Sequence, residues 1–148
     1  MPDVENSDIM KHVLETLINI SSRKTNEGHT ILIMDTLMKK LGKKYDFLKH
    51  VEIKDTRFLE INEPVSVMTD IDKVKSKDMG QAIRDIIMTM NNNLGKDAGH
   101  FFIKEFKNNI EESYHSTIED MGIDLSLMQL EYEVYEMEKR LIKGKSNE

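Results

Sequence analysis

The chain has 148 residues, a formal net charge of −6 from 21 basic and 27 acidic side chains, and no cysteine. This length fits a single domain, which at this size buries roughly 70% of the surface that the unfolded chain exposes. The lack of cysteine excludes disulfides, thiolate metal sites and cysteine nucleophiles. Because nucleic-acid binding depends on neutralising phosphates with Lys and Arg, the acidic balance predicts that nucleic acid is not a partner.

The start of the chain and its hydropathy predict a cytoplasmic protein. Residues 1–8 are acidic, whereas a secretory signal begins with a basic segment followed by an apolar run. The longest apolar run, 31–34, is far shorter than the ~20 residues that span a bilayer. We therefore expect no membrane partner. A domain that needs no disulfide also agrees with a reducing compartment.

Two helices are predicted in the first third of the chain. Apolar residues spaced three and four apart predict a helix over 7–22 that Ser7 caps. A second helix is predicted over 27–41, with Gly42 as its end. Apolar side chains cover most of this second helix, which predicts a place at the centre of the core. Lysines gather near its C-terminus, where the helix dipole favours cations, so we do not interpret them as a nucleic-acid patch. They are Lys39, Lys40, Lys43, Lys44 and Lys49.

The spacing of apolar residues changes over 47–71. Apolar and polar residues alternate there in three runs, which are separated by the turn-forming segments 54–56 and 62–64. Such alternation is typical of strands with one face in water and the other on a core. We therefore predict a three-stranded antiparallel meander in this region.

Three more helices are predicted over 76–95, 97–122 and 124–144. Each begins with Ser or Asp in a capping position and ends at a glycine. The second of them is long, and Asn108-Asn109 could kink or divide it.

These elements define the predicted fold and domain organisation. The fold class is α+β and mainly α-helical, with about five helices and a small three-stranded antiparallel β meander. We find no internal repeat and no linker. The chain is therefore predicted to be one α+β domain over 1–144, followed by a disordered tail over 145–148.

Histidine and carboxylate spacing supplies one candidate metal site. Glu112 and His115 have the Glu-x-x-His spacing of di-iron helical bundles, and His100 follows Asp97 at the same spacing. A complete site needs two such motifs and a glutamate from each of two further helices, and no such set can be assembled. The spacing also arises often by chance. We therefore predict no metal and no cofactor, and keep His100, Glu112 and His115 for an alternative hypothesis, a small helical enzyme or metal-binding protein.

Other catalytic patterns are incomplete. Asp70 and Asp72 could begin a calcium loop, but the position that requires glycine is Lys75. His29 lacks the neighbouring residues of a sensor-kinase phosphoacceptor helix. No Gly-x-Ser-x-Gly, Ser-x-x-Lys or phosphate-binding glycine loop occurs. We therefore assign no catalytic residue and favour a non-enzymatic role.

The last predicted helix has the strongest pattern in the chain. Apolar residues recur at spacings of 3, 4, 3 and 4, which is the a/d pattern of a coiled-coil seam. Acidic residues come early and basic residues late, as a helix dipole favours. A second apolar edge gives this helix more apolar surface than one neighbour covers, which predicts a homodimer interface. Its residues are Leu127, Leu130, Val134, Met137 and Leu141 in the seam, with Tyr132 and Tyr135 on the second edge.

These patterns predict a non-enzymatic regulatory or interaction module that is homodimeric through its C-terminal helix. The 11 methionines fit a core, and they also fit a surface for an apolar small ligand or a protein partner. Besides the enzyme or metal-binding hypothesis, one further alternative is a winged-helix-like transcription regulator. In that alternative the first two helices and the strands form the winged unit, and the last helix is the dimeriser.

Overall fold

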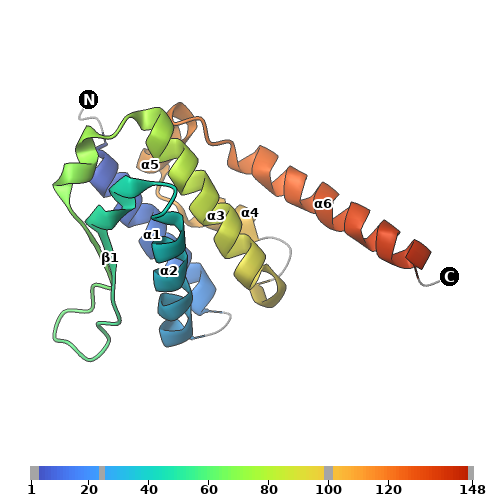
Figure 1. The fold of residues 1–148 in the computed structure, drawn as a ribbon, viewed down its shortest axis with the longest axis horizontal. Helices are drawn as coiled ribbons and strands as arrows, with labels where there is room; N and C mark the ends of the chain where they lie inside the picture. The colour runs from blue at the N-terminus through green and yellow to red at the C-terminus, as the bar shows by residue number, and fades with distance from the viewer. Residues whose placement is uncertain (1–3, 24–25, 99–101, 147–148) are drawn as a thin grey trace.

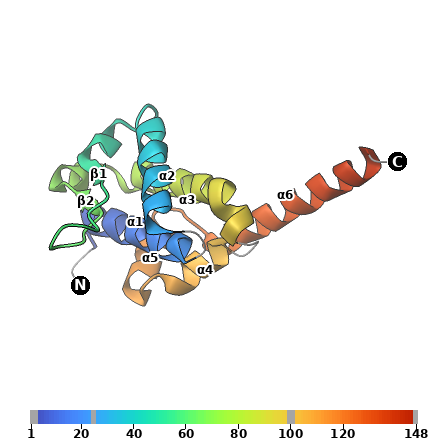
Figure 2. The ribbon, with the colours of Figure 1, turned by 90° about the horizontal axis from the view of Figure 1, so that it is seen from below.

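The computed structural model describes residues 4–23, 26–98 and 102–146, leaving aside the side chains of 94–98 and 143–146. This part of the chain is mainly helical, with six α-helices and one two-stranded antiparallel sheet (Figure 1, Figure 2). None of the helices within these ranges has the length and hydropathy that a membrane crossing needs. The elements, with η for short 3-10 helices, are α1 (Asn6–Ser22), α2 (Glu27–Leu41), η1 (Asp46–His50), β1 (Val51–Ile53), β2 (Val65–Val67), η2 (Thr69–Lys73), α3 (Ser76–Ala98), α4 (Phe102–Asn109), α5 (Glu112–Asp120) and α6 (Leu125–Ser146).

Helix α1 lies at the centre of the hydrophobic core. Its apolar face is buried, and it contacts α2, α3, α4, β2 and η2. The apolar pattern of the sequence predicted α2 in this place, and the structure corrects that prediction. Helix α2 begins and ends where predicted, but Leu32 on its outer face is 64% exposed. Apolar residues on every side of α2 therefore did not lead to burial on every side, because the neighbours of α2 cover only part of its circumference.

The start of α1 is fixed by η2 and not by the predicted cap Ser7. The backbone N–H of Ser7 donates to a carboxylate oxygen of Asp72 at 2.7 Å. The side-chain amide of Asn6 donates to the carbonyl oxygens of Ile71 at 3.0 Å and Val74 at 2.7 Å. A carboxylate at a helix N-terminus satisfies an unpaired N–H and suits the helix dipole. Asp72, which is distant in sequence, thus caps α1 in place of Ser7.

The sheet has two strands in the described residues, where the sequence predicted three. Strand β1 pairs antiparallel with β2, and Val51 lies opposite Val67. The alternating segment 59–61, predicted as a strand, is an irregular loop. The N–H of Leu59 donates to the carbonyl of Thr56 at 3.0 Å, so this backbone forms a local turn and not a ladder. The predicted continuation of β2 is instead the 3-10 helix η2.

The helix predicted over 97–122 is divided, which raises the count of α-helices from five to six in the described residues. The side chain of Asn109 donates to the carbonyl oxygen of Glu105 at 2.7 Å at the end of α4. Glu111 then has an extended backbone, with φ −61° and ψ 140°, before α5 begins. Asparagine bonds readily to nearby backbone, which is why a helix stops there. Helix α6 passes the predicted end at Gly144 and reaches Ser146; residues 147–148 of the predicted tail lie outside the described residues.

Gly80 lets the first turns of α3 approach the turn between α5 and α6. A Cβ atom on Gly80 would overlap the carbonyl oxygen of Met121. Gly122, which follows Met121, has a φ of 89°, in the left-handed region that glycine adopts freely. The N–H of Ile123 donates to the carbonyl of Ile118 at 3.2 Å, which closes the end of α5. This turn sets the direction in which α6 leaves the domain.

Replacing Gly80 with alanine should lower the free energy of unfolding by about 1–3 kcal/mol, because the added methyl group must displace backbone. Urea unfolding measures this change. Gly28→Ala is the matched control, since Gly28 is also helical and its Cβ would meet only the end of the Arg57 side chain. The control should leave stability unchanged or raise it by up to ~1 kcal/mol. Equal losses in both variants would contradict a specific close approach at Gly80.

Candidate functional site

The first two turns of α6 anchor this helix to the domain. Its main packing partner is α4. The side-chain oxygen of Gln129 accepts the N–H of Lys104 at 3.1 Å, and Lys107 donates to the hydroxyl of Ser126 at 2.6 Å. Asp124 caps the helix as predicted by accepting the N–H of Leu127 at 3.0 Å. The side chains of this anchored face that belong to the core are Leu125, Met128 and Tyr132.

The C-terminal part of α6 extends away from the domain (Figure 1, Figure 2), and Tyr132 is the last of its described side chains that is buried. None of its side chains described past that residue is buried. The projecting part, from Glu133 to Ser146, is about 20 Å long at roughly 1.5 Å per residue. A helix that leaves the core in this way offers its whole circumference to solvent or to a partner.

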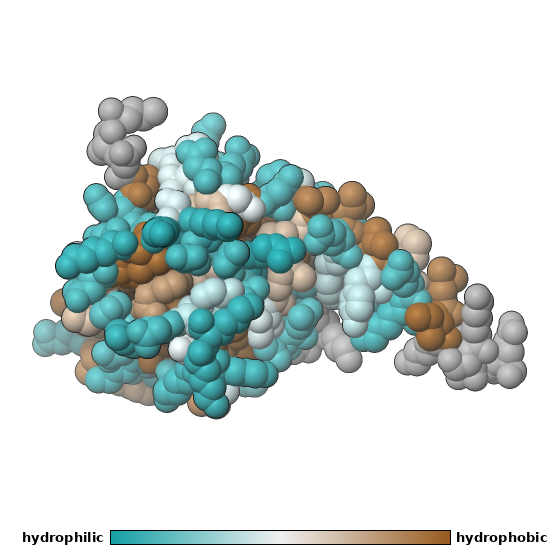
Figure 3. Space-filling view, turned by 45° about the horizontal axis from the view of Figure 1, so that its top comes forward, coloured by the Kyte–Doolittle hydropathy of each residue, from teal (hydrophilic) through white to brown (hydrophobic). Residues whose placement is uncertain are grey.

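The predicted seam lies on the exposed side of α6. At about 100° per residue, its positions point roughly opposite to the anchored face. The exposed fractions of its side chains range from 45% for Val134 to 62% for Met137 and Leu141. Apolar side chains accordingly lie along the extending helix in the space-filling view (Figure 3). The seam is the set Leu127, Leu130, Val134, Met137 and Leu141, all of them exposed in the single chain.

The second predicted edge divides between the core and the surface. Tyr132 is 8% exposed and belongs to the core, so its assignment to the interface is corrected. Burial raises the pKa of its hydroxyl group, as does the carboxylate of Glu136. Tyr135 is exposed, and Lys139 lies 5.9 Å from the centre of its ring. Tyr135 also borders an open hollow beside Met88 of α3.

The candidate metal residues do not come together in the described part of the chain. Glu112 is exposed at the start of α5. His115 is half-buried one turn later and borders an open cleft with Lys107, Glu119 and Asp124. His100 lies outside the described residues. Among the described residues no group of three or more His, Asp or Glu side chains could hold a metal ion.

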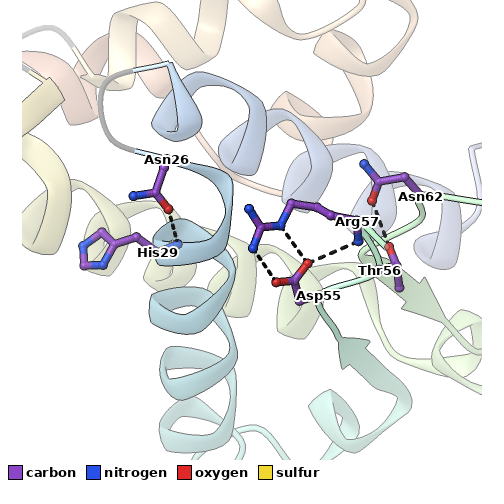
Figure 4. Close-up of polar contacts among 6 residues, drawn as sticks. All are labelled: Asn26, His29, Asp55, Thr56, Arg57 and Asn62. Atoms are coloured by element: carbon purple, nitrogen blue, oxygen red, sulfur yellow. Dashed lines mark hydrogen bonds and ion pairs between the residues drawn. The ribbon is translucent and has the colours of Figure 1, made fainter. Parts of the chain in front are cut away.

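The loop over 56–62 is an exposed apolar surface that the sequence analysis read as a strand. Its neck is closed by the hydroxyl of Thr56, which donates to the side chain of Asn62 at 2.9 Å (Figure 4). Arg57 donates to Asp55 through its Nε at 2.9 Å and Nη2 at 2.8 Å, and its guanidinium packs on the first turn of α2. Asn26 caps that same turn (Figure 4). These contacts hold three large side chains outward: Phe58, which is 91% exposed, Leu59 and Ile61.

The lysines near the end of α2 have local partners. Three of the five form ion pairs with carboxylates at 3.1 Å, and the other cations of this group are exposed. Such surface pairs contribute little to stability, but they place negative charge among the lysines. This supports the interpretation of the group as a helix end and not as a phosphate-binding patch. The pairs are Lys39 with Asp35, Lys44 with Asp85, and Lys49 with Asp46.

Comparison of the chain with models of protein families, with curated protein sequences and with solved structures gave no match. The functional inference therefore rests on the geometry of the chain itself, and α6 is its most distinctive feature.

His12 joins α1 to the junction between α4 and α5. Its ring stacks on Tyr114, with centroids 4.1 Å apart and an interplanar angle of 14°. Its Nε2 accepts the backbone N–H of Glu111 at 3.2 Å, which only the neutral ring can do. Burial lowers the pKa of His12, against the opposing effect of the carboxylates of Glu111 and Glu15. The fold therefore favours the neutral form of this histidine.

The stability of the protein should depend on pH through His12. Below the ordinary histidine pKa of ~6.5 the unfolded chain binds this proton more readily than the folded chain. The contribution of His12 is thus present above ~6.5 and is lost as the pH falls towards the lowered folded value. In urea unfolding between about pH 5 and 7.5, His12→Gln should show a smaller loss of stability at low pH than the wild type. His115→Gln is the control, and a wild-type slope unchanged in His12→Gln would contradict this role.

Proposed function

We propose that this chain is a non-enzymatic interaction module of the cytoplasm that forms a homodimer through the seam of α6. The observation that carries the proposal is the exposure of the seam. Five large or medium apolar side chains in coiled-coil spacing face solvent, on the side of the helix opposite the anchored face. Soluble monomers seldom expose a contiguous apolar stripe of this kind, and a partner helix would bury it.

The length of the projecting helix supports the same proposal. Most of the stability of helices in proteins comes from tertiary packing of an apolar face, so helical turns of ~12–15 residues without such packing are only marginally stable in water. The part of α6 beyond Tyr132 is of this length and has no buried side chain among those described. Pairing through the seam would supply the packing that stabilises these turns.

Other roles have weaker support in the described residues. The metal-binding or enzymatic alternative depends on His115, whose cleft is also lined by Glu119 and Asp124. Among the described residues, however, no three such side chains are placed so that they could hold a metal ion. The winged-helix-like regulator would use the β1–β2 hairpin, but its loop exposes the apolar side chains of Phe58, Leu59 and Ile61. Over 54–64 this loop also carries three acidic side chains against two basic ones, which does not favour contact with phosphates. Three of the five lysines near the end of α2, which could otherwise contact phosphate, form ion pairs with carboxylates.

Val134→Asp should convert the dimer into a folded monomer. An aspartate at this position would place an unpaired carboxylate in the centre of the interface, which costs several kcal/mol. Each ~1.4 kcal/mol raises Kd tenfold, so Kd should rise by at least about 100-fold. Light scattering over a concentration series measures the change, with circular dichroism to verify folding.

Ile61→Asp is the matched control, because it places the same charge at an exposed apolar residue of the 56–62 loop. This variant should dimerise like the wild type. A wild-type protein that stays monomeric at high concentration would contradict the proposal. Loss of the dimer in Ile61→Asp but not in Val134→Asp would assign the interface to the loop.

A further inference from the structure

The two flanks of the seam carry different charges. In heptad geometry Glu133 and Arg140 lie on one flank, one heptad apart, and Glu131 and Glu138 lie on the other. Glu133 and Arg140 border the same hollow beside the seam, together with Met137. Glu131 already forms an ion pair with Arg84 of α3 at 3.5 Å. Among the residues whose side chains are described, the first flank thus carries an acid and a base and the second carries two acids; Lys145 follows on the second flank one heptad after Glu138.

The orientation of two paired helices decides which flanks meet. In an antiparallel two-fold pair, like flanks meet, and Glu133 can lie beside Arg140 of the second copy. In a parallel pair, opposite flanks meet, and Glu133 lies beside Glu138 of the second copy. Flanking charges of opposite sign favour an arrangement and like charges disfavour it. The antiparallel pair brings Glu131 towards Glu138, but the ion pair with Arg84 already compensates Glu131. Charge therefore favours the antiparallel orientation.

The length of the helix selects one antiparallel register. When Leu125 lies opposite Ser146 of the second copy, the two helices overlap along all of their 22 residues. In this register every layer of the central seam is apolar, and the acid and base of the first flank meet. A shift by one heptad towards the N-terminus would instead place Glu133 against Glu133 of the second copy. The central layers of the full-overlap register are Leu130 with Leu141 and Val134 with Met137, each formed twice by symmetry, and Leu127 lies opposite position 144 at each end of the seam.

We propose that the seam is covered by α6 of a second copy of this chain, running antiparallel in the full-overlap register. This inference rests on the homodimer proposed above and adds its orientation and register. The antiparallel pair places the two anchored segments, residues 125–132 of each chain, at opposite ends. The two domains are therefore far apart, and neither blocks the seam, which lies opposite the anchored face.

Disulfide cross-linking tests the orientation directly, because the natural chain has no cysteine. Leu130→Cys and Leu141→Cys are mixed at equal amounts, one of them labelled with heavy nitrogen, and oxidised. In the proposed register residue 130 lies opposite 141 of the other copy, whereas two residues 130 are about 16 Å apart along the axis. A disulfide requires Cα atoms within ~7 Å, so the mixed product should exceed each self-linked product by about tenfold.

Each outcome of the cross-linking supports or overturns the proposal. Mainly self-linked Leu130→Cys would show a parallel pair and overturn the orientation while leaving the homodimer intact. Efficient linking of Leu130→Cys with Val134→Cys, and not with Leu141→Cys, would overturn the register. No cross-link together with a wild type that is monomeric in light scattering would show that the homodimer itself is wrong.

The sign of a charge effect gives an independent test. Glu133→Lys should raise Kd several-fold at low salt, because the lysine would face Arg140 of the second copy. Adding Arg140→Glu should return Kd towards the wild-type value. In a parallel pair Glu133→Lys would face Glu138 and lower Kd instead, which would overturn the proposal. Analytical ultracentrifugation measures these constants, with Glu52→Lys on the exposed face of β1 as the control for net charge.

Discussion

Helix α6 has two apolar faces that point in opposite directions, and a single neighbour can cover only one of them. The inner face contributes Met128 and Tyr132 to the core, α4 is the main packing partner of the helix, and the bond between Gln129 and Lys104 fixes it there. Burial of such side chains supplies roughly 25 cal/mol for each Å² of apolar surface removed from water. The outer face carries the seam, whose side chains stay exposed in the single chain and so do not supply this free energy of burial. The proposed homodimer is the simplest way to bury both faces, since one self-complementary surface is sufficient.

The rest of the fold positions this helix. Gly80 allows α3 to lie against the turn at Met121, and Gly122 closes α5 in a conformation that other residues rarely adopt. The break between α4 and α5 lets α4 pack beside α1 at the centre of the core while Tyr114 of α5 stacks on His12, which also bonds to that break. Helix α6 therefore leaves a well-packed domain from an anchored base. A projecting helix can present a seam to a partner only if its base is held in this way.

The sequence predicted features that depend on local spacing and missed those that depend on distant neighbours. The seam followed from recurrence at three and four residues, and the cap at Asp124 followed from its place before an apolar run. The alternation of apolar and polar residues around Leu59 and Ile61 would look the same in a strand and in a loop. Only the hydrogen bond from the N–H of Leu59 to the carbonyl of Thr56 shows that this segment is a turn. Tyr132 was grouped with the interface because its spacing cannot reveal that this side chain is buried in the core of the chain. The cap that Asp72 provides for α1 joins residues 65 positions apart and has no local signal.

Amide hydrogen exchange of α6 beyond Tyr132, measured over a dilution series, tests most directly whether a second copy covers the seam. In a monomer these turns would have almost no tertiary packing and would exchange rapidly at every concentration. If the seam is buried between two copies, their protection should rise with protein concentration, while the protection of α1 in the core stays constant. Protection of these turns that is weak and independent of concentration, up to the highest concentration measured, would contradict the dimer.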